Sequence, residues 1–270
     1  MTSAILTRPL LMIGCGNMAG AMLEGWLRAG TDPRMITVVR PSGRPPAAGI
    51  RTLTVLPEDE TPALVLLGVK PQKLGEIAPV LAPVLEPETL LVSILAGTTL
   101  ETLRGAFPSP RAVVKAMPNL PVSLGKGVTE LHTDAATPAE ARAEVEALMR
   151  PLGQVEWLDD ESLFAVASAL TAAAPAFLYR FIDALAAAGA ELGLPPDQAA
   201  RLAARMAEGA AALAAASPET PEQLARRVAS PGGTTEAGLR VLDDQGGLLT
   251  LISRAIAASR RRGQEMARKA

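Results

Sequence analysis

The sequence predicts an α/β protein with an N-terminal Rossmann-type dinucleotide-binding domain followed by an all-α C-terminal domain. Short apolar runs alternate with helix-length segments as far as about residue 158, an alternation typical of βαβ units on a parallel sheet. Alanine-rich segments with larger apolar residues at helical spacing then run nearly to the end, which indicates helices. We therefore expect domains at residues 1–159 and 160–270.

The expected strands are short apolar runs. In chain order they are Pro9–Ile13, Met35–Val39, Ala63–Val69, Leu90–Leu95 and Arg111–Ala116. Two further candidates, Val128–His132 and Gln154–Leu158, flank a helix expected at Pro138–Met149. Proline and glycine mark the breaks between the later helices, which we expect at Glu161–Ala173, Pro175–Leu192, Pro195–Ala216, Pro221–Val228, Thr235–Leu242 and Leu248–Ala267.

Composition excludes several classes of protein. Hydrophobic residues make up 49% and charged residues 20% of 270 residues, with a net charge of −2, so we expect a globular chain without a basic patch for nucleic acid. The longest apolar runs fall short of the roughly 20 residues that span a bilayer, and we expect no leader. Cys15 is the single cysteine, which fits a reducing compartment. We expect a cytoplasmic protein without a membrane anchor or metal site, and the alanine-rich helices suggest a homo-oligomer.

A glycine-rich loop follows the first expected strand. Gly14-Cys15-Gly16-Asn17-Met18-Ala19 has the G-x-G-x-x-G/A pattern of dinucleotide-binding loops and lies, as it must, between a strand and a helix. Gly14 permits the tight turn, Gly16 lets the backbone approach the pyrophosphate, and Ala19 keeps the helix close to the strand. Phosphate oxygens would then meet free amides at the helix N-terminus.

The end of the second strand predicts which dinucleotide binds. An acidic residue there would bond the ribose 2′-hydroxyl and repel a 2′-phosphate, but the sequence has Arg40 and Ser42. A guanidinium and a hydroxyl suit a phosphate. We therefore predict NADPH as the cofactor, with NADH as a weaker alternative, and the competing interpretation is a solvent-exposed arginine.

The carboxyl ends of two later strands lie at the same edge of such a sheet. Ligands bind at this edge of a parallel sheet. One carries Val69, Lys70 and Pro71, and the other carries Ala96 and Gly97. Lys70 could reach a ribose or phosphate, whereas ordinary turn chemistry is the alternative for both segments.

A second loop, Ser230-Pro231-Gly232-Gly233-Thr234-Thr235, separates two of the expected helices. Thr234 or Thr235 is placed to cap the helix that follows. Free amides and hydroxyls at a helix start also suit a small carboxylate. From these residues alone, the two interpretations are equally supported.

These segments together resemble those of pyrroline-5-carboxylate reductase. The resemblance rests on the glycine loop, Val69-Lys70-Pro71, Ala96-Gly97, Met117-Pro118-Asn119-Leu120-Pro121 and Ser230–Thr235, and it extends from about Pro9 to Glu265. It implies NADPH-dependent reduction of the imine carboxylate 1-pyrroline-5-carboxylate to L-proline, the last step of proline biosynthesis. It also implies a helical domain that binds substrate and dimerises by intertwining, often within a ring of dimers.

The resemblance further implies roles for individual residues. Asn119 and the Gly14–Met18 loop, which includes Asn17, would contact the cofactor. Ser230, Gly232, Gly233, Thr234 and Thr235 would hold the substrate, with the Thr235 hydroxyl bonded to the ring nitrogen as the catalytic contact. A cyclic imine is electrophilic once protonated and chiefly needs orientation, so the single histidine, His132, is expected to be structural.

Hydroxyacid dehydrogenases share such a front half but use a helix-borne lysine for acid–base chemistry. After Lys126 the chain has only Lys269, so the interior of the helical domain lacks such a lysine, which argues against that chemistry. A reductase of a related cyclic imine and a non-catalytic NADP-binding protein remain as alternatives.

The family typically has Ser-Gly-Ser-Gly-Pro-Ala where this chain has Thr171-Ala172-Ala173-Ala174-Pro175-Ala176. Either Ala174 caps a new helix, or the alanines carry the preceding helix up to Pro175.

Overall fold

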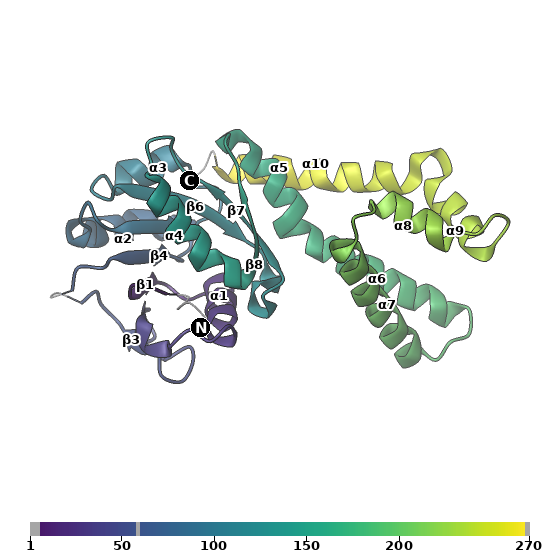
Figure 1. Cartoon of the computed structure of the whole chain (residues 1–270), viewed down its shortest axis with the longest axis horizontal. Coiled ribbons are helices and arrows are strands. Elements are labelled where there is room, and N and C mark those ends of the chain that lie inside the picture. The colour runs from purple at the N-terminus through teal and green to yellow at the C-terminus, as the bar shows by residue number, and fades with distance from the viewer. Residues whose placement is uncertain (1–5, 58–59, 268–270) are drawn as a thin grey trace. The chain divides into compact units, whose positions relative to one another are not determined.

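The computed structural model describes residues 6–57 and 60–267. The chain divides into two compact units, one comprising Met1–Ala172 with Arg260–Ala270 and the other comprising Ala173–Ser259. The first unit contains a sheet with helices, and the second is formed by helices (Figure 1). The predicted fold class, a Rossmann-type domain followed by an all-α domain, is therefore confirmed.

Within the described residues the first unit contains an eight-stranded sheet with the order β3-β2-β1-β4-β5-β6-β7-β8. The strands are β1 Leu10–Ile13, β2 Ile36–Val39, β3 Arg51–Leu53, β4 Leu64–Leu67, β5 Leu90–Ser93, β6 Ala112–Pro118, β7 Gly127–His132 and β8 Gly153–Trp157. All neighbouring strands are parallel except β6 and β7. The turn between β6 and β7 is too short for a crossover, so β7 returns antiparallel.

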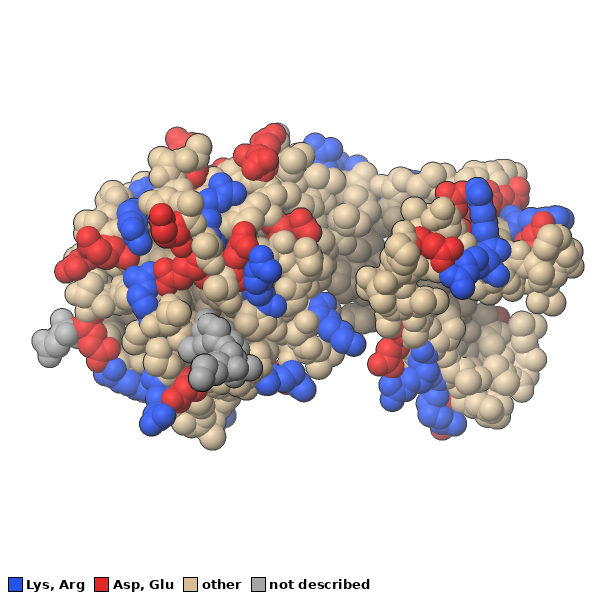
Figure 2. All heavy atoms as spheres, in the orientation of Figure 1, with Lys and Arg blue, Asp and Glu red and all other residues tan. Residues whose placement is uncertain are grey.

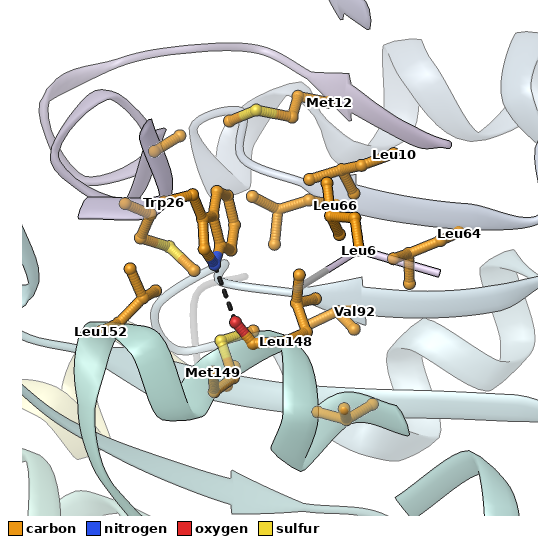
Figure 3. Close-up of a cluster of buried hydrophobic side chains, with 14 of the residues drawn as sticks. Leu6, Leu10, Met12, Trp26, Leu64, Leu66, Val92, Leu148, Met149 and Leu152 are labelled. Atoms are coloured by element: carbon orange, nitrogen blue, oxygen red, sulfur yellow. Dashed lines mark hydrogen bonds between the residues drawn. The ribbon is translucent and has the colours of Figure 1, made fainter. Parts of the chain in front are cut away.

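Helices cover both faces of this sheet. They are α1 Asn17–Arg28, α2 Leu74–Leu81, α3 Leu100–Ala106 and α4 Ala139–Met149. Alternate residues of β1 divide the core into two layers: Leu10 and Met12 pack with residues of α1 and α4, while Leu11 and Ile13 pack with residues of α2 and α3. In the first layer, the Trp26 indole donates a hydrogen bond of 2.7 Å to the Leu148 carbonyl (Figure 3). This bond ties α1 to α4 inside the apolar layer.

The later helices follow the expected boundaries closely. They are α5 Phe164–Ser168, α6 Ala174–Glu191, α7 Pro196–Ala216, α8 Pro221–Val228, α9 Thr234–Asp243 and α10 Gly247–Ala267, with a π-helical turn at Ala169–Ala173. Gly193, at φ +108°, ends the segment before α7, as expected for a residue without a Cβ. A reciprocal pair of hydrogen bonds between Thr220 and Gln223 caps α8.

Residues Glu161–Glu191 are helical without a break. Of the two alternatives for the alanine stretch, the structure thus shows the second, because Ala173 is in right-handed helical conformation and no side chain caps α6. In the described part of the chain this is the one helix long and apolar enough to cross a membrane, judged by length and composition alone. Helices buried in a core or an interface share these properties.

Candidate functional site: the carboxyl edge of the sheet and the Ser230–Thr235 loop

The glycine loop begins directly after β1. The Gly14 amide donates to the Val39 carbonyl at 2.8 Å, and Gly14 has a φ of +85°. A Cβ on Gly14 would lie 2.9 Å from the Gly68 carbonyl oxygen, so both the conformation and the space require glycine. Gly16 precedes α1 without a side-chain cap, and a Cβ on it would meet nothing within 4 Å. Open space therefore borders the N-terminus of α1, as a bound pyrophosphate requires.

Ala19 holds α1 against the neighbouring strand end. Its side chain is 1% exposed, and its Cβ lies 3.0 Å from where a Cβ of Gly68 would be. A larger residue at either position would push the helix away from the sheet. Asn17 is exposed at the start of α1, whereas Met18 is half-buried against the core.

Arg40 follows β2 at the same edge. Its amide donates to the Leu53 carbonyl at 2.9 Å, which fixes its backbone beside β3. Burial raises the pKa of the Cys15 thiol, and the positive charge of Arg40 partly offsets this effect, so the guanidinium lies near the glycine loop. Among the described residues no hydrogen bond or ion pair engages that guanidinium. Ser42 is exposed two residues further on, and its hydroxyl accepts from the Arg44 amide at 3.4 Å.

The ends of β4 and β5 complete this edge. Val69 is partly buried in the core, and Lys70 is exposed beside it, with Pro71 starting a short 3₁₀ turn. Gly97, at φ +78°, follows the exposed Ala96. Directly after them comes Thr98, which sequence reasoning did not single out. It is 2% exposed, and its hydroxyl has no hydrogen-bond partner among the described residues.

Asn119 follows the carboxyl end of β6, and its side chain is bound to protein at both ends. The amide nitrogen donates to the Thr171 carbonyl at 3.0 Å, and the amide oxygen accepts from the Val128 amide at 2.9 Å. Asn119 is 6% exposed. The residues predicted to contact the cofactor thus gather at the carboxyl edges of β1, β2, β4, β5 and β6. The link from Asn119 to Thr171 has no signal in the sequence.

The Ser230–Thr235 loop belongs to the second unit. Gly232 has a φ of +71°, and its amide donates to the Glu236 carboxylate at 2.6 Å. The residue at the cap position of α9 is Gly233, so, of the two interpretations of this loop, the threonine cap was wrong. Thr234 and Thr235 form the first turn of α9, and no side chain caps that turn. Among the described residues neither threonine hydroxyl forms a hydrogen bond, so both can bind a ligand.

The single histidine, His132, is held by contacts within the fold. His132 is 8% exposed, its Nδ1 lies 2.7 Å from the Leu158 carbonyl oxygen, and its ring meets Phe164 edge-on. Lys269 lies outside the described residues. No group of three or more potential metal ligands occurs among the residues that the structure describes.

Comparisons with known proteins cover nearly the whole chain. Residues 161–266 match the family model "Pyrroline-5-carboxylate reductase dimerisation", and residues 10–97 match "NADP oxidoreductase coenzyme F420-dependent". The chain is 34% identical to a pyrroline-5-carboxylate reductase of Pseudomonas aeruginosa over 97% of both chains. It is 33% identical to that of Pisum sativum, over 92% of this chain and 93% of the other.

The chain belongs to the pyrroline-5-carboxylate reductase family. A solved structure of a pyrroline-5-carboxylate reductase from Coxiella burnetii superposes with a TM-score of 0.84 at 29% identity, covering 97% of this chain and 99% of that one. The family resemblance stated from the sequence is therefore confirmed. The match of residues 10–97 to NADP oxidoreductases likewise agrees with the predicted cofactor.

Proposed function

We propose that this protein reduces 1-pyrroline-5-carboxylate to L-proline with NADPH, the last step of proline biosynthesis. The observation that carries the proposal is the family relationship over nearly the full length. The open N-terminus of α1 fits the required cofactor, and so does Arg40 at the end of β2, whose guanidinium has no partner among the residues that the structure describes. NADPH supplies the hydride, and this chain has to bind and orient both reactants.

The cofactor residues have distinct tasks in this proposal. The amides of the Gly14–Met18 loop, including Gly16 and Asn17, cradle the pyrophosphate. Arg40 and Ser42 hold the 2′-phosphate, because a permanently charged planar fork binds phosphate well. The remaining contacts come from the other strand ends: Val69, Lys70, Pro71, Ala96, Gly97 and Asn119. NADH, which lacks the 2′-phosphate, should bind more weakly.

The Ser230–Thr235 loop holds the imine carboxylate. The free amides in the first turn of α9, with the hydroxyls of Ser230 and Thr234, suit the carboxylate, and the Thr235 hydroxyl bonds the ring nitrogen. The amides of Gly232 and Gly233 donate to Glu236 and to the Ser230 carbonyl, so they would have to exchange these partners to reach the substrate. The imine nitrogen takes a proton from solvent, and hydride addition to the carbon of the protonated imine then gives the neutral amine. A hydrogen bond at the nitrogen therefore follows the change of charge there. No buried acid or base is required by this chemistry.

In the proposed organisation, residues 1–159 bind NADPH and residues 160–270 bind substrate and form a homodimer or a ring of dimers. The match of residues 161–266 to a dimerisation model supports this division. On the face drawn in Figure 2, acidic and basic side chains are interspersed, unlike a nucleic-acid-binding surface. A cytoplasmic location without a membrane anchor is part of the proposal.

A related cyclic imine is the second candidate substrate. It is favoured by one observation: helix replaces the family's glycine-containing segment at Thr171–Ala174. A narrower or shifted substrate site would follow from that change. A non-catalytic NADP-binding protein is the remaining alternative.

The direct test is NADPH oxidation, followed by absorbance, on addition of 1-pyrroline-5-carboxylate to the purified full chain, with proline identified as the product. We expect steady turnover. NADPH binding without turnover on any cyclic imine carboxylate would instead support a non-catalytic protein. Faster turnover of a larger or smaller ring would identify the second candidate.

A substitution at Thr235 tests the substrate site. We expect Thr235→Ala to lower kcat/KM for the imine by about 10- to 100-fold, as for the loss of one hydrogen bond to a developing charge, about 1.4–3 kcal/mol. The dissociation constant for NADPH should not change. Thr235→Ser, which retains the hydroxyl, is the matched control. Wild-type kinetics in the alanine variant would remove Thr235 from the mechanism.

A further inference from the structure

Glu130 is a buried carboxyl group that the reaction does not use. It lies in the middle of β7 and is 2% exposed. One carboxyl oxygen is hydrogen-bonded to the Thr171 hydroxyl. The other is buried without a hydrogen-bond partner among the described residues. An ionised carboxylate in that position would leave a buried negative charge half unsatisfied, which is costly.

Thr171 lies in the π-helical turn Ala169–Ala173 and is held on two sides. Its hydroxyl oxygen is bonded to Glu130 and also lies 3.0 Å from the Ala167 carbonyl oxygen. Its own carbonyl accepts the hydrogen bond from Asn119. π turns within α-helices are frequent at functional sites. Here the turn links a buried carboxyl group to a residue at the carboxyl edge of the sheet.

Both hydrogen bonds of the Thr171 hydroxyl can form together in only one of the two protonation states of Glu130. A hydroxyl has one hydrogen, so Thr171 cannot donate to both Glu130 and the Ala167 carbonyl. If Glu130 is neutral, its acid group donates to the Thr171 oxygen, and Thr171 donates to Ala167. Burial raises the pKa of Glu130, and the hydrogen bonds with Thr171 and with the main chain of Glu130 only partly offset this effect. Burial and the two contacts of the Thr171 hydroxyl together favour the neutral form.

Charged groups on the same sheet face are engaged elsewhere. Lys115 of β6 pairs with Glu161. His132, opposite Lys115 on β7, is hydrogen-bonded through Nδ1 to the Leu158 carbonyl. Glu156, opposite Glu130 on β8, is exposed and accepts from Gln154 at 2.9 Å. Among the described residues no cation forms an ion pair with Glu130, so none compensates an ionised carboxylate there.

We propose that Glu130 is a neutral carboxylic acid whose hydrogen bond to Thr171 fixes the π turn and thereby positions Asn119 for cofactor binding. The first part stands on the cluster itself, and the second rests on the proposed role of Asn119. Glu130 is thus a positioning residue that acts through Thr171. Glutamine at this position can still donate to the Thr171 oxygen, whereas leucine cannot.

Infrared spectroscopy of the full chain at neutral pH tests the protonation state without any substrate. We expect the carbonyl band of a protonated carboxylic acid in the wild type, its loss in Glu130→Gln, and its shift to higher frequency in Thr171→Val, which removes the hydroxyl. Glu156→Gln, the matched exposed substitution, should leave the band unchanged. A wild type without the band, or a band unaffected by Thr171→Val, would overturn the proposal.

NADPH titration, followed by the fluorescence of the nicotinamide, tests the positioning role. We expect Glu130→Leu and Thr171→Val each to raise the dissociation constant about five- to tenfold, as for one lost hydrogen bond, while Glu130→Gln remains within about twofold of the wild type. Equal values in the leucine and glutamine variants would overturn the positioning role. Neither measurement needs the imine, so a failure of the proposed reaction would be seen separately, as absence of turnover in the wild type.

Discussion

Gly14 and Gly16 differ in what a side chain would meet. At Gly14 a methyl group would lie 2.9 Å from a carbonyl oxygen, on a residue with φ +85°, whereas at Gly16 it would meet nothing within 4 Å. The first glycine is therefore required by the fold. The second is not required by the fold, and it serves a ligand that approaches the backbone.

This difference predicts that one alanine substitution lowers stability and the other weakens NADPH binding. Gly14→Ala should lower the free energy of unfolding by at least about 1–2 kcal/mol, because a left-handed conformation disfavours a Cβ. Gly16→Ala should leave the melting temperature unchanged but raise the NADPH dissociation constant about tenfold or more. Thermal unfolding and NADPH titration of both variants check this. A Gly16→Ala variant with unchanged NADPH affinity would argue against pyrophosphate binding at this loop.

Arg40 should determine the choice of dinucleotide. We expect Arg40→Glu to raise the KM for NADPH about 10- to 100-fold, since charge-assisted hydrogen bonds contribute about 1.5–3 kcal/mol and the new carboxylate repels a phosphate. The KM for NADH should change little. Arg44→Glu, which reverses an exposed charge four residues later, controls for the general loss of positive charge. An unchanged ratio of the two KM values in Arg40→Glu would contradict the assignment.

At the scale of elements, the pattern of apolar residues was enough to predict β1, β2, β4, β5 and β6, because each is a buried run between turn residues. It could not predict β3, whose three residues Arg51–Leu53 contain no apolar run. That strand exists through its register with Thr37–Val39 of β2. The direction of β7 was likewise not predictable from its own residues, since it follows from the short connection to β6.

The site was predictable to a similarly uneven degree. The glycine loop is local, so its backbone requirements are visible in the sequence. Contacts between distant segments are not: Asn119 and Thr171 are 52 residues apart, and Thr171 and Glu130 are 41 apart. The cap of α9 was misassigned because Ser, Thr and Gly all suit that position, and only the backbone geometry distinguishes them.

The alanine segment before Pro175 gives a prediction about one element. In the variant that combines Ala172→Gly, Ala173→Ser and Ala174→Gly, two glycines should lower the free energy of unfolding by roughly 2 kcal/mol, about 1 kcal/mol each. If the continuous helix restricts the substrate site, kcat/KM for 1-pyrroline-5-carboxylate should rise while NADPH affinity stays the same. Ala173→Ser alone is the control that keeps helix propensity nearly intact. No gain in kcat/KM, or a loss, would show that the alanines are compatible with the ordinary reaction.

At the scale of the whole molecule, the helices of the second unit leave large apolar side chains exposed. On α7, Leu202, Met206 and Leu213 are 54%, 51% and 57% exposed, and their spacing places them on one face of the helix. Ala199 and Ala203, which border this face of α7, are buried. Contiguous exposed apolar surface of this kind is typical of an interface, and residues 161–266 match a dimerisation model.

We therefore expect light scattering to give a dimer, or a multiple of it, at micromolar concentration. Burying a side chain of this size contributes about 1.5–3 kcal/mol, and placing a carboxylate in the same interface removes that contribution and adds a desolvation penalty. Met206→Glu should accordingly shift the protein toward the monomer. Val80→Glu, at a 59% exposed apolar position on α2, is the control for adding a charge to an exposed apolar site and should leave the mass unchanged. If Met206→Glu retains the wild-type mass at the lowest measurable concentration, the apolar face of α7 does not form the interface, and another exposed face of the helical unit must be tested in the same way.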